Sequence, residues 1–378
     1  MANSLSRYFK SHFFTIGVFA FIICSILAFS LPWLFTQTKI SFLDFSNTGQ
    51  IGDTIGGTLG PFIAWIAAFL TYLAFWAQFK ANEQQRLDIK TERFENQFYK
   101  ILDIIRQNED CIKSGIYQGK PATEELLGEY FFIYALVCSS YKYLSKKSKV
   151  IFSDVANSSV SPKDLFLVRV AYGLFYYGKM YQYERLNEDN SQKYNNLRSL
   201  ADSIKKNVIA FSNQQVIGNI DYRTFMMSDN LNLDFNSVHY RYKILLGHND
   251  TIGIYFRQLF QLIEFISMQD ETILSEEEKY NHVKIVRAQM SEFEQALLFY
   301  NSLSDFGSSW NIPVDTDPKN VSDMGYIARY RLLRNIPSNI YWYGPTPVDF
   351  YKKESNYWYN KRKKHFIERE LLFIADGK

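Results

Sequence analysis

The residues best suited to catalysis in this chain are Arg241 and His248, which are separated by six residues. An arginine can hold a phosphate while a histidine moves protons, so the pair has the side chains needed to cleave a phosphodiester. Gly247 directly precedes His248 and is a residue at which a helix could end. The other histidines are scattered without metal-ligand spacing, and neither a phosphate-cradling glycine loop nor a Gly-x-Ser-x-Gly turn is present. The sequence therefore predicts no metal and no cofactor, and it offers this pair as the catalytic candidate.

Two further arginines, Arg257 and Arg287, lie on strongly amphipathic segments with a helical period. Gln289, Ser291 and Glu294 follow Arg287, and the latter two are one and two helical turns away from it. This spacing favours a buried arginine–glutamate network that fixes the packing of helices. The alternative interpretation is a pocket that accepts an anion or the acidic side chain of a partner.

The C-terminal tail combines positive charges with aromatic rings. Basic side chains interleaved with stackable rings are typical of surfaces that bind single-stranded nucleic acid. The same composition suits an anionic lipid surface or a plain solvated face, and the sequence leaves these three interpretations open. The residues of this candidate surface are Lys352, Lys353, Trp358, Lys361, Arg362, Lys363 and Lys364.

Two apolar stretches, residues 13–35 and 55–79, precede all of these candidates, and neither contains a formal charge. Each is long enough to cross a bilayer core, which takes about 20 apolar residues. We expect a transmembrane hairpin, which argues against a freely diffusing enzyme. The alternative is that the first stretch is a cleaved signal peptide, since Ala28-Phe29-Ser30 offers small residues at a suitable spacing.

The distribution of Lys and Arg predicts the orientation of this hairpin. Basic residues flank it in the N-terminal segment 1–12 and directly after the second span, whereas the connecting loop 36–54 contains only Lys39. Positively charged flanks remain in the cytoplasm. We therefore expect a multi-pass protein of the bacterial inner membrane with both termini in the cytoplasm.

Small residues gather at the start of the second span, where Gly52, Gly56, Gly57 and Gly60 are spaced at or near four residues. Glycines at this spacing allow helix backbones to approach closely in lipid, so these residues are a candidate face for self-association. An equally supported interpretation is a flexible entry of the chain into the membrane. The spans contain no ionisable side chain, which argues against a proton relay or a charged selectivity filter.

The remainder of the chain reads as helical, which predicts an all-α fold. A stalk helix is expected over residues 80–118 and a helical cytoplasmic domain over 119–378, with the stretch 312–359 largely irregular. Among 378 residues the chain has 32 Phe and 27 Tyr, which we interpret mainly as helix-packing core. The net charge of +3 does not by itself indicate a nucleic-acid-binding protein, and the three cysteines are too few and too scattered for a disulfide framework. The helices expected within the domain cover 123–144, 162–181, 196–212, 251–268, 276–303 and 321–335.

Five segments of the chain resemble the phage abortive infection family and occur in that family's order. They begin at Ile51-Gly-Asp-Thr, Phe94-Glu-Asn-Gln, Ala171-Tyr-Gly-Leu, Tyr255-Phe-Arg-Gln and Val286-Arg-Ala-Gln. The resemblance implies a two-span anchor, a helical cytoplasmic domain and a role in bacterial defence against phage. In its layout the chain is also similar to the two-transmembrane effectors encoded beside retron reverse transcriptases, which implies such an enzyme with its RNA–DNA hybrid as a partner.

From the residues and the resemblance together we expect a membrane-anchored, non-enzymatic effector that is held inactive by a partner. On infection it would form a homo-oligomer and permeabilise the inner membrane. Two alternatives remain at this point. The Arg241–His248 spacing is similar to the arrangement found in HEPN ribonucleases, which implies a tethered ribonuclease toxin. The chain could also be a scaffold that recruits another toxin.

Overall fold

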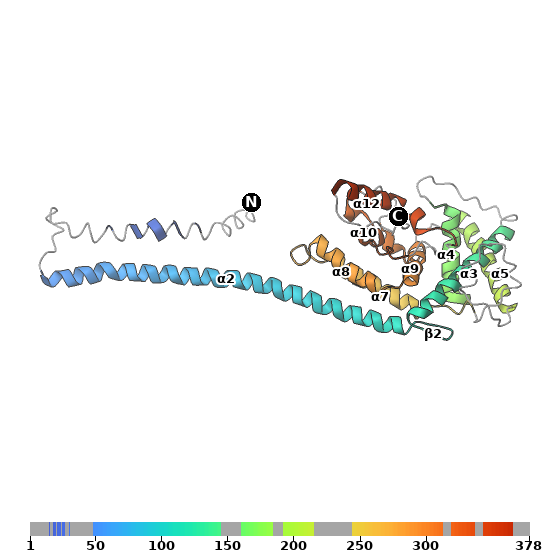
Figure 1. Ribbon diagram of the computed structural model, residues 1–378, viewed down its shortest axis with the longest axis horizontal. Coiled ribbons are helices and arrows are strands. Elements are labelled where there is room, and N and C mark those ends of the chain that lie inside the picture. Colours follow the sequence, from blue (N-terminus) through green and yellow to red (C-terminus); the bar gives the residue numbers. More distant parts are fainter. Residues whose placement is uncertain are drawn as a thin grey trace. The chain divides into compact units, whose positions relative to one another are not determined.

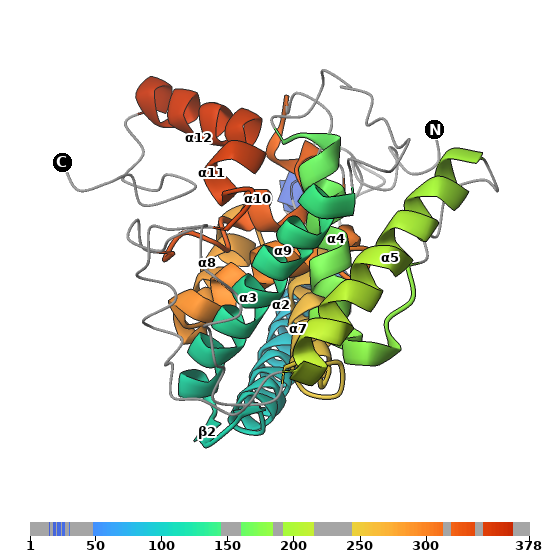
Figure 2. The same cartoon turned by 90° about the vertical axis from the view of Figure 1, so that its right-hand side faces the viewer.

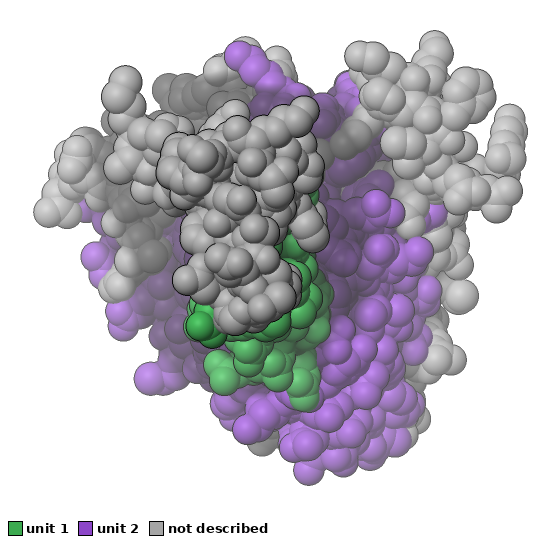
Figure 3. Space-filling view, turned by 90° about the vertical axis from the view of Figure 1, so that its left-hand side faces the viewer, with its two compact units in different colours: residues 1–93 green, residues 94–378 purple. Residues whose placement is uncertain are grey.

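The protein is helical almost throughout the parts that the computed structural model describes, as the sequence predicted. These parts are residues 48–144, 160–183, 192–214, 244–312, 319–336 and 343–365, with scattered positions between 15 and 30 (Figure 1). The chain divides into two compact units, residues 1–93 and 94–378 (Figure 3). The second unit contains every side chain outside the spans that the sequence identified as a candidate.

The longest element is helix α2, which runs from Thr48 to Asp110. Residues 48–54 were assigned to a loop, but they are already helical, so this boundary was wrong. The predicted stalk also ends earlier, at Asp110, where a short antiparallel hairpin follows, made of β1 (Lys113–Ser114) and β2 (Tyr117–Gln118). Gly115 and Gly119, in and after this hairpin, have φ of 57° and 69°, a conformation that glycine adopts at little cost.

The last turns of α2 pack within the second unit. Phe94, Phe98, Leu102 and Ile105 are buried at spacings of four, four and three residues, which places them on one helical face. The ring of Phe94 stacks on Phe265 at 5.3 Å between ring centroids. The buried face of the stalk helix therefore packs within the same chain from Phe94 onward.

In the second unit, helix α3 packs against α4, α5 and α9, and helix α7 packs against α8 (Figure 2). The first of them begin and end close to the predicted positions because their start signals are strong. Ser161, for example, accepts a hydrogen bond from the backbone N–H of Asp164 at the start of α4, as expected of an N-cap. The longer helices are α3 (Lys120–Leu144), α4 (Pro162–Tyr177), α5 (Gln192–Gln214), α7 (Ile252–Ser267), α8 (Glu276–Gln289) and α9 (Glu292–Leu303).

The C-terminal part of the chain differs most from the prediction. The helix expected over 321–335 is reduced to the 3₁₀ turn η3 (Val321–Asp323) and the short helix α10 (Tyr326–Tyr330). The stretch thought to be irregular up to residue 359 contains α11 (Pro347–Phe350) and most of α12 (Lys352–His365). Prolines and aromatic residues hid these helices, since their pattern has no clear helical period.

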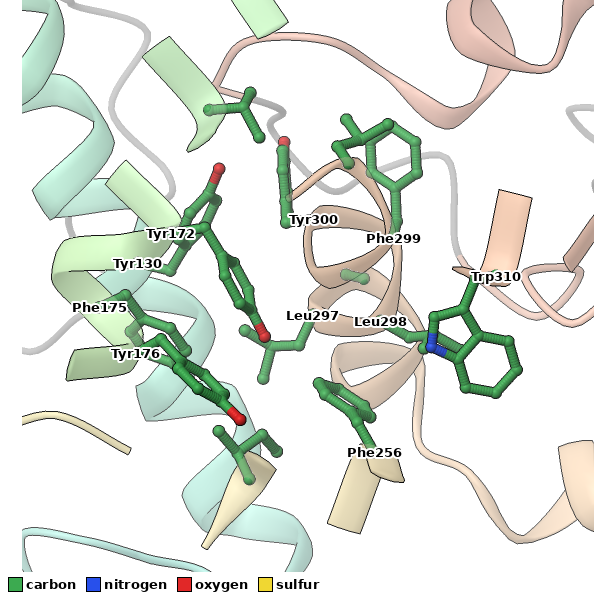
Figure 4. Packing of buried hydrophobic residues seen from close by; sticks show 14 of the residues in the cluster. Tyr130, Tyr172, Phe175, Tyr176, Phe256, Leu297, Leu298, Phe299, Tyr300 and Trp310 are labelled. Carbon is green, nitrogen blue, oxygen red and sulfur yellow. The ribbon is translucent and has the colours of Figure 1, made fainter. Parts of the chain in front are cut away.

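Tyrosine and phenylalanine rings form the centre of the second unit, as their abundance suggested. The ring of Tyr130 on α3 lies 4.4 Å from that of Tyr300 on α9, and Tyr172 and Phe175 on α4 complete the group (Figure 4). All four side chains are fully buried. The hydroxyl of Tyr172 accepts a hydrogen bond from the side-chain amide of Asn301 at 3.0 Å, so the polar end of this buried ring is satisfied.

Candidate functional site

The apolar part of α2 is exposed in the structure. One helix in the described part of the chain is long and apolar enough to cross a membrane, Gly60–Asp110, and none of its most apolar window is buried. Ile63, Ile66 and Phe75 are each about half exposed or more, at 68%, 49% and 68%. A helix that is apolar on every side and largely exposed suits a hydrocarbon surround. Length and composition therefore allow one membrane-spanning helix here.

Most of the first apolar stretch lies outside the described residues. At one of the described positions, Phe21, the ring stacks on Phe69 of α2 with 3.9 Å between centroids and lies 5.3 Å from the ring of Trp65. This contact brings part of the first stretch alongside the second.

The glycines proposed as an association face, Gly56, Gly57 and Gly60, lie inside α2, as does Gly52. The backbone is helical through these residues, which argues against a flexible entry of the chain into the membrane. Among the described atoms outside the helix's own backbone, none lies within 4 Å of a Cβ built on Gly56, Gly57 or Gly60, so a second helix could approach them closely. Self-association through them stays a prediction.

The segment expected to form one helix over 276–303 is broken at Met290. Ser291 starts a new helix, α9, in which its hydroxyl accepts from the backbone N–H of Glu294 at 3.1 Å. The Glu294 carboxylate in turn accepts from the backbone N–H of Ser291 at 2.5 Å, which completes a capping box. The Ser-x-x-Glu signal was present in the sequence, but the apolar pattern continues across it and conceals the break.

This break separates two residues that were expected to pair. Arg287 ends α8 and donates hydrogen bonds to the backbone carbonyls of Arg331 at 2.9 Å and Tyr330 at 3.5 Å. It therefore caps the C-terminal end of α10, where carbonyl oxygens carry a partial negative charge. Since Glu294 is held by Ser291, the contacts of these two residues do not include the predicted arginine–glutamate pair.

Glu294 belongs instead to a group that we call the carboxylate cluster, in which Glu109, Tyr255 and Glu294 are buried and Ser291 is half-buried. The side chain of Lys120, its fifth member, is 51% exposed. Glu109 is in the last turn of α2 and is 5% exposed, and Glu294 is 0% exposed. The ammonium of Lys120 lies 3.6 Å from the Glu109 carboxylate and also donates to the backbone carbonyl of Gln289 at 2.6 Å. Gln289, a predicted site residue, thus contributes its backbone to this region.

The electrostatics of the carboxylate cluster are unusual. Burial, assisted by the negative charge of Glu109, raises the pKa of Glu294 to about 7. Burial also raises the pKa of Glu109, although the nearby Lys120 opposes the effect. Burial raises the pKa of Tyr255 well above its usual value, and the two carboxylates raise this pKa further. Sequence reasoning missed Glu109 and Tyr255, because nothing in the local pattern indicates that they meet Glu294.

A second charged group surrounds Arg331, whose guanidinium lies 4.1 Å from the ring centre of Tyr280 and 4.2 Å from that of Trp358. Such stacking of a cation between two rings is stabilising. Burial, together with the neighbouring Arg287 and Arg334, lowers the pKa of Arg331 to about 9. Burial lowers that of Arg287 to about 10.

The other predicted arginine, Arg257, makes a simpler contact. Its Nη1 donates to the hydroxyl of Tyr176 at 3.1 Å and so links α7 to α4. Arg257 and Arg287 therefore lie in different surroundings. The hydrogen bond of Arg257 links α7 to α4, and those of Arg287 link α8 to the end of α10, so both residues fix helix packing.

Two aromatic rings of the C-terminal tail, those of Tyr351 and Trp358, face inward. Trp358 is 8% exposed and its Nε1–H donates to the backbone carbonyl of Ala328 at 3.0 Å, and Tyr351 is fully buried. The prediction that Trp358 provides a stacking surface for bases was therefore wrong, because its ring is occupied by the protein. Lys352 is exposed and Lys353 half-buried, whereas the side chains of Lys361, Arg362, Lys363 and Lys364 lie outside the described part of α12.

The catalytic candidate His248 is buried in a structural contact. Its Nε2 lies 2.9 Å from a carboxylate oxygen of Glu129 on α3, whose other oxygen accepts from the backbone N–H of Leu245 at 3.1 Å. Burial disfavours the charge on His248, but Glu129 outweighs this effect, and the pKa of His248 is raised. Arg241 lies outside the described residues. A histidine sealed in this way has no access to a phosphodiester, so this candidate loses its support.

Two glycines allow the loop that carries His248 to approach α4. Gly178, directly after α4, has φ of 58°, and a Cβ built there would lie 2.3 Å from the carbonyl oxygen of Leu245. Gly247 has φ of 87°, and a Cβ built there would lie 3.0 Å from the carbonyl carbon of Tyr177. The two backbones are closer than side chains on either glycine would allow.

No group of three or more His, Cys, Asp or Glu side chains in the described parts of the chain could hold a metal ion. Comparison with known families gives one match: residues 247–340 match the model of the family described as putative phage abortive infection protein. The resemblance seen in the sequence is thus confirmed over this segment, which includes Glu294 and the arginines around Arg331 and supports a role in phage abortive infection. No curated protein and no solved structure matches the chain.

Proposed function

We propose that this chain, whose residues 247–340 carry the sequence of the abortive infection family, is a membrane-anchored effector of phage defence. In this proposal the two apolar stretches form a hairpin in the bacterial inner membrane, and both termini are in the cytoplasm. The helical body restrains the hairpin in uninfected cells. Infection releases this restraint, and several copies then assemble and make the membrane leak.

The observation that carries the proposal concerns α2. This helix is apolar and exposed where it could span a membrane, and its last turns are buried against the segment that matches the family. Phe94 stacks on Phe265, and the side chain of Asn108 donates to that of Gln258 at 2.6 Å, so both contacts reach α7. A change in the packing of the body would therefore act directly on the helix that we propose to be the active part.

The expected lesion is poorly selective. Residues 55–79 contain no charged side chain that could select an ion or carry protons, which leaves assembly or distortion of the bilayer as the cause of leakage. Close approach of helices at Gly56 and Gly60 would support such an assembly.

The proposed restraint also requires a partner. Helix α12 begins with Lys352-Lys353, and its sequence continues to Lys361-Arg-Lys-Lys364, a run of basic residues that suits a nucleoprotein partner. A retron reverse transcriptase with its RNA–DNA hybrid is the partner that the resemblance implies. Since the Trp358 ring is buried, such a partner would be held by charge rather than by base stacking.

Inducible expression in bacteria without neighbouring genes, followed with a membrane-potential dye, tests the function. Ile66→Arg places a charge near the middle of the apolar segment, which costs about 3 kcal/mol of insertion free energy. Gln85→Arg adds the same side chain to the same helix, at an exposed position beyond the apolar segment. We expect the wild type and Gln85→Arg to depolarise cells and Ile66→Arg to spare them, at equal protein levels. Depolarisation by all three proteins would refute the proposal.

A further inference from the structure

We infer that Glu109 and Glu294 hold one proton between them, and that loss of this proton loosens the last turn of α2 from the body. This inference rests on the proposed function, since it concerns how the membrane helix is restrained. It assigns to the carboxylate cluster the role of a proton-operated latch.

Too little positive charge lies near Glu109 and Glu294 to neutralise both carboxylates when they are ionised. Both are buried, and the described cation nearest to them, Lys120, is shared between Glu109 and the carbonyl of Gln289. One carboxylate oxygen of Glu294 is tied to the backbone of Ser291. Its other oxygen, Oε1, is buried and makes no hydrogen bond of ordinary length in the described structure, although the Tyr255 hydroxyl interacts with the Glu294 side chain. Burial with so few partners penalises an ionised carboxylate much more than a protonated one, because the protonated form is neutral.

The groups around the cluster come from four helices. Lys120 on α3 favours ionisation of both carboxylates, and Tyr255 on α7 faces them with its hydroxyl. Asp110 and Arg106, next to Glu109 on α2, have opposite effects on its pKa. With both glutamates ionised, the two buried carboxylates would thus have Lys120 as their ion-pair partner, and its side chain is half exposed and screened by solvent.

The pKa of Glu294, raised to about 7 from its usual 4.5, agrees with this geometry. Because the closed state binds the proton more tightly than an open state would, its stability is greatest at low pH and declines as the pH rises from 4.5 towards 7. The latch would therefore hold in an acidified cytoplasm and loosen in an alkaline one. For a closed-state pKa of 7 and an open-state pKa of 4.5, opening increases about tenfold between pH 6 and pH 8.

Hydrogen exchange on the full chain in detergent micelles tests the latch. Protection of the peptides covering residues 99–110 is measured at pH 6 and pH 8 and corrected for the intrinsic pH dependence of exchange. We expect wild-type protection to decrease about tenfold, and Glu294→Gln to remove the decrease. Glutamine can replace glutamate in a capping box, so this variant keeps the start of α9.

Glu292→Gln is the matched control, because Glu292 is exposed in the same helical turn. It should retain the wild-type pH dependence. Glu109→Gln should weaken the dependence without removing it, because burial, the larger cause of the raised pKa of Glu294, remains. The inference is overturned if Glu294→Gln keeps the tenfold change, or if the wild type shows none. The result is separate from the proposed function, since exchange reports opening of α2 whether or not cells expressing the protein depolarise.

Discussion

Replacing Gly178 with alanine should destabilise the body severely, through two separable effects. The first is backbone strain, because a φ of 58° with a ψ of −138° is a conformation that few residues other than glycine adopt, and it costs an L-residue about 1–3 kcal/mol. The second is a collision, because the new methyl group would lie 2.3 Å from the carbonyl oxygen of Leu245 and 2.9 Å from the backbone nitrogen of Gly247. Neither atom can rotate away, so the loop must move, at a further cost of about 1–3 kcal/mol. The expected total is about 2–6 kcal/mol.

Gly119→Ala separates these effects. Gly119 has a similar φ of 69°, but the nearest atom to a Cβ there is 3.7 Å away, at ordinary contact distance. This variant should therefore suffer backbone strain without a collision, and its free energy of unfolding should fall by only about 1–2 kcal/mol. Urea unfolding in micelles gives the difference in free energy of unfolding between the two variants, provided that the slope of this free energy against urea concentration is the same for both.

The collision should also have a local consequence. Moving Leu245 away from Gly178 pulls on the two contacts that the loop makes with Glu129, through the Leu245 N–H and His248. Exchange of the Leu245 amide should therefore be faster in Gly178→Ala than in Gly119→Ala. Equal stability of the two variants, or an unchanged Leu245 amide, would refute the close approach of these backbones.

Two further substitutions test the buried contacts. Glu129→Gln leaves His248 buried without its counter-charge and should lower the free energy of unfolding by about 3 kcal/mol. Because Glu129 raises the pKa of His248, the loss measured by urea unfolding should be largest below pH 6.5 and smaller at pH 8. A loss of stability that grows with pH would contradict the Glu129–His248 pair. Trp358→Phe removes the hydrogen bond to Ala328 and should cost about 1 kcal/mol without changing binding to single-stranded DNA. Weaker DNA binding at unchanged stability would show instead that the ring contacts bases.

Helices whose first turn carries a strong N-cap signal were predicted well from the sequence. Ser161 followed by Pro162, and Ser275 followed by three glutamates, fix helix starts within a few residues, and both start where expected. Ser291 and Glu294 carry an equally good signal, but the apolar residues on either side form a continuous pattern, so the break in the helix was concealed.

The composition of the sites was visible in the sequence, but their arrangement was not. Glu109 looks like one more polar residue at the end of α2, and only the fold brings it to Glu294. In the same way, the aromatic and basic residues around Trp358 suggested an outward-facing surface, because composition does not say which side of α12 meets the core. Contacts between distant segments decide both cases.

The most direct test of the account is expression of residues 94–378 alone, the second compact unit, without the first 93 residues. Growth and membrane potential are followed beside the full-length protein, with the amount of folded fragment checked by proteolysis. If the membrane helix is the active part, the fragment should be harmless at levels where the full chain stops growth and depolarises the cells. A fragment that stops growth as effectively as the full chain would contradict the account, because the toxic activity would then reside in the helical body.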